Sequence, residues 1–177
     1  EIEKEFRAQI EKIQHYTTIT HIDSLDYVHA IPEIFELTCK LAIEYNIPYI
    51  RNHYEEFYIV PKLKYILNYK FLANLPKLIQ LNMYSSVNRN TLQSYALKTN
   101  KYIIGIGYRG MINAQTLEAG LKTLSDEDNI TVETVINPCS YLRNQNDSFS
   151  AEFKITQDKI LEDTICRMGY DITNHKV

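Results

Sequence analysis

The segment "THIDSLDYVHAIPEIFELTCKLAIEYNIPYIR" (residues 20–51) decides the fold that this sequence predicts. An amphipathic stretch begins at Pro32, and a short apolar run, "NIPYIR" (46–51), follows it. Proline is common in the first turn of a helix, and a short apolar run bounded by turn residues is typical of a buried strand. The stretch before Pro32 opens with a short β-branched run. The segment therefore predicts strand, helix and strand, which is the repeating unit of a parallel sheet.

The same alternation continues along the rest of the chain. We expect helices at residues 1–15, 32–45, 113–124 and 156–169, with further helical segments at 62–83 and 89–98. We expect strands at 16–23, 46–51, 129–137 and 170–173, another at the start of 101–111, and a polar loop at 143–150. Asn113 and Thr156 are the expected N-caps, and Gly169 is the expected helix stop. The sequence therefore predicts an α/β fold with mostly parallel strands, whose site would lie where the strands end.

Composition excludes several classes of function. The net charge is −3 with no basic stripe, which argues against nucleic-acid binding, and no apolar run has the roughly 18–20 residues that a membrane helix needs. Three widely spaced cysteines argue against a disulfide framework and a thiolate zinc site, so we expect reduced cysteines and a cytoplasmic protein. The G-x-G at 105–107 lacks a third glycine and an acidic partner, so a dinucleotide site is not expected.

The chain opens inside a helical pattern. Ile2, Phe6, Ile10 and Ile13 recur at helical spacing, and no N-cap precedes them. We therefore expect an upstream segment to be absent from this chain. If Glu1 is the true start, exposed sheet edges and apolar helix faces predict self-association or a partner that covers the gap.

Four potential metal ligands lie within nine positions: His21, Asp23, Asp26 and His29. On a strand, His21 and Asp23 would point to the same face. Zinc sites need three or four ligands, and a third is not evident here, although Asp26 could substitute. The alternative is that His21 and His29 are hydrogen-bonded groups that frame a pocket.

A family pattern accounts for this cluster. The pattern begins with T-H-x-D-S-H-H-H-V-H-x-x-P and continues with a helix, the run Y-G-I-P and an Arg. Ten residues of this chain match it without a gap: Thr20, His21, Asp23, Ser24, Val28, His29, Pro32, Ile47, Pro48 and Arg51. Residues 105–124, "GIGYRGMINAQTLEAGLKTL", look like the same family's G-x-x-G turn and helix, and "VETVINPCSYL" (132–142) looks like its E-L-x-x-H-P segment. The chain thus resembles the YdjC-like carbohydrate deacetylases.

The resemblance implies a fold and an activity. It implies an incomplete (β/α) barrel-like domain, with residues 1–177 a single domain that corresponds to the C-terminal two thirds of a family member. It also implies a divalent metal, Mg or Zn, that activates water for hydrolysis of the N-acetyl group of a chitooligosaccharide-type sugar, with a general acid that protonates the amine. The family places a metal ligand directly after D-S and the acid in H-P, as well as two ligands in its N-terminal part.

Both of those positions are changed in this sequence. Leu25 stands at the metal-ligand position and Asn137 at the acid position. Leucine has no lone pair for a metal, and asparagine cannot deliver a proton near neutral pH. The sequence therefore predicts that no catalytic residue is intact, that His21 and His29 are vestigial metal ligands, and that the metal is not bound. Asp23 and Arg51 are the expected substrate contacts.

Several alternatives stay open. The chain could be an active deacetylase, an inactive relative that binds sugar or protein or is a gene remnant, or an unrelated α/β binding module. Arg51 could contact substrate, or form an ion pair with Asp23, Glu55 or Glu56. Tyr54, Tyr58 and Tyr108 could line a sugar groove or pack in the core. His53, Glu55 and Glu56 are interpreted as a solvated loop cluster.

Overall fold

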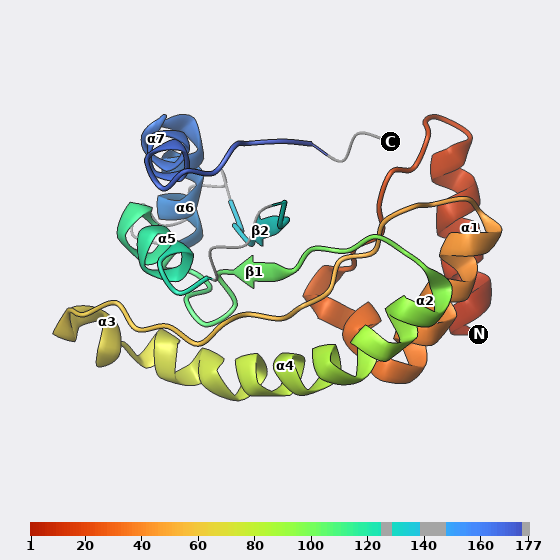
Figure 1. Ribbon diagram of the computed structural model, residues 1–177, viewed down its shortest axis with the longest axis horizontal. Helices are drawn as coiled ribbons and strands as arrows, with labels where there is room; N and C mark the ends of the chain where they lie inside the picture. Colours follow the sequence, from red (N-terminus) through yellow and green to blue (C-terminus); the bar gives the residue numbers. More distant parts are fainter. Residues whose placement is uncertain (125–128, 139–147, 175–177) are drawn as a thin grey trace. The chain divides into compact units, whose positions relative to one another are not determined.

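The computed structural model describes residues 1–124, 129–138 and 148–174 (Figure 1). The chain divides into two compact units. The first comprises Glu1–His53, Leu81–Lys101 and Asn174–Val177, and the second comprises Tyr54–Gln80 and Tyr102–Thr173. The long helix α4 (Tyr69–Tyr95) contributes its first part to the second unit and its second part to the first.

The first unit is built on helices α1 (Ile2–Gln14) and α2 (Pro32–Glu44), joined through the short 3₁₀ segment η1 (Leu25–Ala30). The helices expected at 1–15 and 32–45 are therefore confirmed, with Pro32 in the first turn of α2. Apolar side chains of both helices and of the last turns of α4 form one core, whose buried members are Ile10, Phe35, Cys39, Leu41, Ala42, Ile47, Ile50 and Leu92.

Among the residues of the first unit that the structure describes, strand pairing consists of isolated parallel bridges. Ile22 pairs with Ile50, and Tyr49 pairs with Lys98. The strand expected at 16–23 is wrong except at Ile22, because residues 15–17 form a turn and bend after α1. The run at 46–51 does pair, but only at its last residues.

The second unit contains a two-stranded parallel sheet. Strand β1 (Tyr102–Ile104) pairs with β2 (Val132–Thr134), and Ile103 lies opposite Glu133. The remaining helices of this unit are α3 (Leu63–Ile66), α5 (Ala114–Leu121), α6 (Ser148–Gln157) and α7 (Ile160–Arg167). The core of this unit draws buried residues from these elements, from the first part of α4 and from connecting segments. They are Tyr58, Val60, Tyr65, Phe71, Ile104, Tyr108, Ile112, Leu117, Leu121, Leu124 and Leu161.

Helix ends in the second unit test the expected caps. Asn113 caps α5, since its side chain accepts from the backbone N–H groups of Gln115 and Thr116. Gly169 follows α7 in the left-handed region at φ +83°, as expected of a helix stop. Thr156 is not a cap, because it lies inside α6 and its hydroxyl donates to the Phe153 carbonyl at 2.7 Å.

Other expectations are only partly met. Residues 62–83 and 89–98 are not two helices, because α4 runs through Pro76 as a single helix. No strand forms at 170–173. Of the loop expected at 143–150, Ser148–Ser150 belong to α6, and the rest lies outside the described residues. The mixture of helices with short parallel strands is confirmed. Among the described residues, no helix is long and apolar enough to span a membrane.

Candidate metal centre

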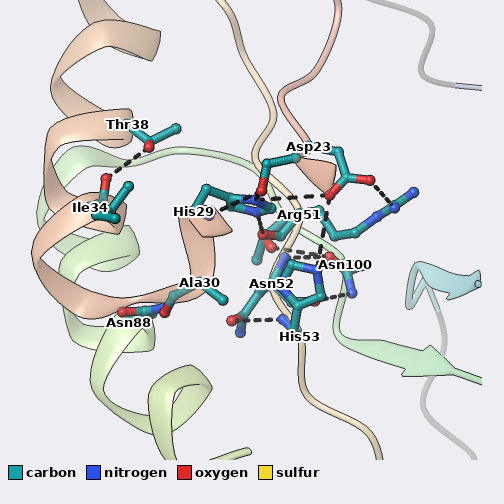
Figure 2. Close-up of polar contacts among 12 residues, drawn as sticks. Asp23, His29, Ala30, Ile34, Thr38, Arg51, Asn52, His53, Asn88 and Asn100 are labelled. Carbon is teal, nitrogen blue, oxygen red and sulfur yellow. Dashed lines mark hydrogen bonds and ion pairs between the residues drawn. The ribbon is translucent and has the colours of Figure 1, made fainter. Parts of the chain in front are cut away.

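Asp23, His29 and His53 come together in the first unit (Figure 2). One potential ligand atom from each residue lies within 4.8 Å of the other two. The Asp23 Oδ1 atom is 3.9 Å from His29 Nδ1 and 3.9 Å from His53 Nε2. Both histidines are buried, whereas the Asp23 side chain is 32% exposed. The arrangement thus places one accessible carboxylate beside two buried imidazoles.

A left-handed turn places His29 in this cluster. Asp26 and Tyr27 have φ values of 53° and 65°, and this conformation costs a non-glycine residue about 1–3 kcal/mol. The buried Tyr27 ring contacts the His53 ring edge-on, with 4.9 Å between centroids. At the end of η1, the Asn88 side chain of α4 donates to the Ala30 carbonyl at 2.8 Å. Packing and this hydrogen bond therefore hold a strained turn in place.

The hydrogen bonds of His29 fix its tautomer. Its Nε2 atom lies 3.0 Å from the Arg51 carbonyl, which can only accept, so Nε2 carries the proton. When the ring is neutral, the Nδ1 atom has a lone pair, which accepts from the Ser24 hydroxyl at 2.6 Å. The Ser24 oxygen in turn accepts from the His29 backbone N–H at 3.0 Å. Histidines that bind metals are commonly held by a carbonyl in this way, through the other ring nitrogen.

Two buried asparagines hold the backbone beside His53. The Asn52 N–H donates to Asn100 Oδ1 at 2.8 Å, and Asn100 Nδ2 donates to the Asn52 carbonyl at 2.7 Å. The His53 N–H donates to Asn52 Oδ1 at 3.0 Å. These bonds, drawn in Figure 2, fix the extended chain that carries His53 toward Asp23.

Arg51 forms an ion pair with Asp23. Its Nη1 atom bonds to Asp23 Oδ2, so the two carboxylate oxygens face different partners. The ion pair of Arg51 with Asp23, one of the alternatives that the sequence leaves open, is therefore present. The guanidinium neutralises the Asp23 charge, and Oδ1 faces the two imidazoles.

The three residues fit a divalent cation. Imidazole nitrogens and one carboxylate are a ligand set that zinc, iron and related metals use. Because Nε2 donates its proton to the Arg51 carbonyl, Nδ1 is the atom of His29 that can offer a lone pair to a metal when the ring is neutral. A cation bound to Nδ1 would take the place of the Ser24 hydrogen bond.

The other predicted site residues lie outside this cluster. His21 is exposed, and its Nδ1 atom lies 3.0 Å from the Thr20 hydroxyl. Leu25 is 84% exposed. Asn137 belongs to the second unit, where its backbone N–H donates to Glu152 Oε2 at 2.8 Å. Asp26, the possible substitute ligand, is exposed and is not part of the cluster.

The interpretation of His53, Glu55 and Glu56 as a solvated loop cluster is wrong at two positions. His53 and Glu55 are each only 1% exposed. The spacing could have indicated His53, because residues two apart on an extended chain share a face, and His53 is two positions after Arg51. Tyr58 and Tyr108 are buried and stack on each other, which confirms core packing for both.

Glu55 occupies a cradle of backbone N–H groups in the second unit. Its carboxylate accepts from Gly105 at 2.7 Å and from Gly107 at 2.8 Å, and burial raises its pKa to about 7. Gly105 has φ +117°, and a Cβ atom there would lie 2.7 Å from the Val135 carbonyl oxygen. The G-x-G sequence therefore serves to bind an internal carboxylate.

A model of the YdjC-like protein family matches residues 1–166. The chain belongs to the YdjC-like family. Curated relatives named carbohydrate deacetylase are 45% identical over 49 residues in Clostridium beijerinckii and 47% identical over 49 residues in Brevibacillus brevis. Each alignment covers 27% of this YdjC-like chain and 20% of the relative.

A solved structure shares the fold of this YdjC-like chain. It is the crystal structure of a protein from Enterococcus faecalis V583 named as a candidate cellobiose-phosphate cleavage protein, with a TM-score of 0.65 and 18% identity. The similarity covers 98% of this chain and 59% of that one. The chain therefore spans less than two thirds of the length of these relatives.

Proposed function

We propose that this chain is the metal- and sugar-binding part of a carbohydrate deacetylase, and that it does not release acetate by itself. The observation that carries the proposal is the convergence of Asp23, His29 and His53. The relatives named carbohydrate deacetylase support the sugar ligand. We also propose that the described elements belong to a larger barrel-like domain, for which the parallel pairings of short segments are the support.

In this proposal Asp23, His29 and His53 hold the divalent cation. A cation at such a site polarises a carbonyl and lowers the pKa of water. Arg51 positions two of these ligands. The Arg51 carbonyl fixes the tautomer of His29, and the Arg51 guanidinium orients the Asp23 carboxylate.

Two residues support the absence of turnover. Leu25 offers no ligand atom at the position where the family pattern has a histidine. Asn137 offers no titratable proton where the pattern has an acid, and a general acid contributes about 10²–10⁴-fold to rate. The buried Nδ2 atom of Asn137 has no hydrogen-bond partner among the described residues. These features favour binding over hydrolysis.

Calorimetric titration with zinc tests the proposal. We expect one zinc ion to bind per chain, and His53→Ala to weaken binding at least about a hundredfold, since even outer partners of metal ligands are worth 10–100-fold. The matched control is His21→Ala, an exposed histidine of the same segment, which should bind zinc as the wild type does. Equal affinity in the two variants would contradict the proposed ligand set.

An acetate assay tests the absence of turnover. We expect no acetate from diacetylchitobiose with zinc, magnesium or cobalt. Release of acetate that is lost in His53→Ala would show an active deacetylase and overturn that part of the proposal.

A second function is favoured by the Asp23–Arg51 ion pair. This pair already neutralises the carboxylate, so the same residues could form a hydrogen-bonded network in a sugar-binding protein that needs no metal. Sugar binding that is unchanged by the chelator EDTA, together with no zinc binding, would support this alternative.

A further inference from the structure

A cavity of about 380 Å³ adjoins the metal centre in the first unit. Its lining includes two groups of side chains, together with Gln9, His21 and Thr38. Asp23, Ser24 and His29 contribute polar atoms from the centre itself, while Phe6, Ile10 and Ile13 of α1 form an apolar wall. Ile19, Ile22 and Leu41 extend that wall. The cavity therefore joins two of the proposed ligands, Asp23 and His29, to a predominantly apolar space.

The size of this space exceeds what an acetyl group needs. Pockets of about 300–1,000 Å³ hold whole small molecules, mostly through apolar walls with a few polar groups that fix orientation. The methyl group of an acetyl would fill only a small part of the wall formed by α1. Leu25, which also lines the cavity, adds apolar surface at the position of the missing ligand.

We propose that this cavity takes the acyl chain of an N-acylated amino sugar, a chain longer than acetyl, with its amide beside Asp23 and His29. The inference rests on the proposed function, because the centre supplies the polar contacts of the amide. The apolar wall would make the cavity bind a long acyl chain more tightly than a short one. Each methylene that is fully buried is worth about fourfold in affinity.

The test is calorimetric titration of the zinc-loaded protein with N-octanoylglucosamine and N-acetylglucosamine. Octanoyl has six more methylenes than acetyl, and burial of two or three of them predicts at least about tenfold tighter binding. Ile13→Asp places a charge in the wall and should abolish the preference. Ile2→Asp is the matched control, since Ile2 lies on the same helix, is 48% exposed against 49% for Ile13, and does not line the cavity.

Each outcome decides the proposal. Equal affinity for the two sugars, or the same behaviour of Ile13→Asp and Ile2→Asp, would overturn it. Octanoate alone binding as tightly as N-octanoylglucosamine would overturn the assignment to a sugar. Zinc binding measured on the same samples separates the two proposals: zinc without an octanoyl preference refutes the acyl cavity alone, and an octanoyl preference without zinc binding refutes the metal centre alone.

Discussion

Asp23 in the first unit and Glu55 in the second are both partnered carboxylates, but their partners differ in kind. Glu55 is fully buried and accepts hydrogen bonds from the backbone of Gly105 and Gly107. Asp23 is partly exposed and faces side chains, namely Arg51 and two imidazoles. A carboxylate enclosed by backbone donors holds a turn together, whereas one beside titratable side chains and a cavity can exchange its partners for a ligand.

Removal of the two carboxylates should separate these roles most clearly. Glu55→Ala leaves two buried N–H groups without their acceptor, at about 1–3 kcal/mol each, so we expect the free energy of unfolding to fall by about 3 kcal/mol or more. Asp23→Ala breaks a partly exposed ion pair and should cost about 1 kcal/mol or less. Urea denaturation of both variants measures the difference, and equal losses would contradict the comparison.

The pH dependence of stability should follow Glu55. Burial raises its pKa from 4.5 to about 7, so the folded state holds this proton more tightly than the unfolded state does. The resulting stability is fully present below about pH 4.5 and is lost as the pH rises through about 7, by about 3 kcal/mol. Burial also raises the pKa of Glu152, which adds a loss in the same direction.

Urea denaturation at a series of pH values between 4 and 8 measures this loss. Glu55→Gln cannot titrate and should flatten most of the slope, leaving the part due to Glu152. A wild-type slope that survives unchanged in Glu55→Gln would assign the titration to another group.

The smallest expected effect concerns the strained turn beside Asp23. Asp26→Gly removes a side chain from a residue with φ 53°, and glycine adopts this conformation readily. Because glycine also gains freedom in the unfolded chain, we expect a net change in the free energy of unfolding within about 1 kcal/mol. Tyr27→Gly has the same backbone benefit but loses the ring contact with His53, so it should destabilise clearly in the same denaturation experiment.

The sequence predicts the helices better than the strands, for a physical reason. The helices α1, α2 and α5 carry their signals locally, in apolar periodicity, Pro32 and the Asn113 cap. Strand signals at 16–23 and 170–173 are β-branched composition alone, and pairing depends on a neighbour distant in sequence. Ile22 finds such a neighbour in Ile50, whereas residues 170–173 form no strand.

The candidate site likewise contains residues that a local sequence pattern predicts and one residue that it does not. His29 and Asp23 lie in one recognisable motif, and their selection needs no tertiary structure. His53 is 24 residues beyond His29, and a polar sequence, "RNHYEEF" (51–57), surrounds it. Its burial comes from the Tyr27 ring and from the paired amides of Asn52 and Asn100, which are contacts that no local pattern reports.

The fixed tautomer of His29 makes this residue a spectroscopic reporter. A buried imidazole N–H that donates to a carbonyl exchanges slowly with solvent and gives a proton resonance of its own. The opposite nitrogen, Nδ1, is the atom that faces Asp23, so its ¹⁵N chemical shift senses any change at the centre while the Nε2 proton stays in place. The ring thus reports an arriving ligand from inside the protein, without any added label beyond ¹⁵N.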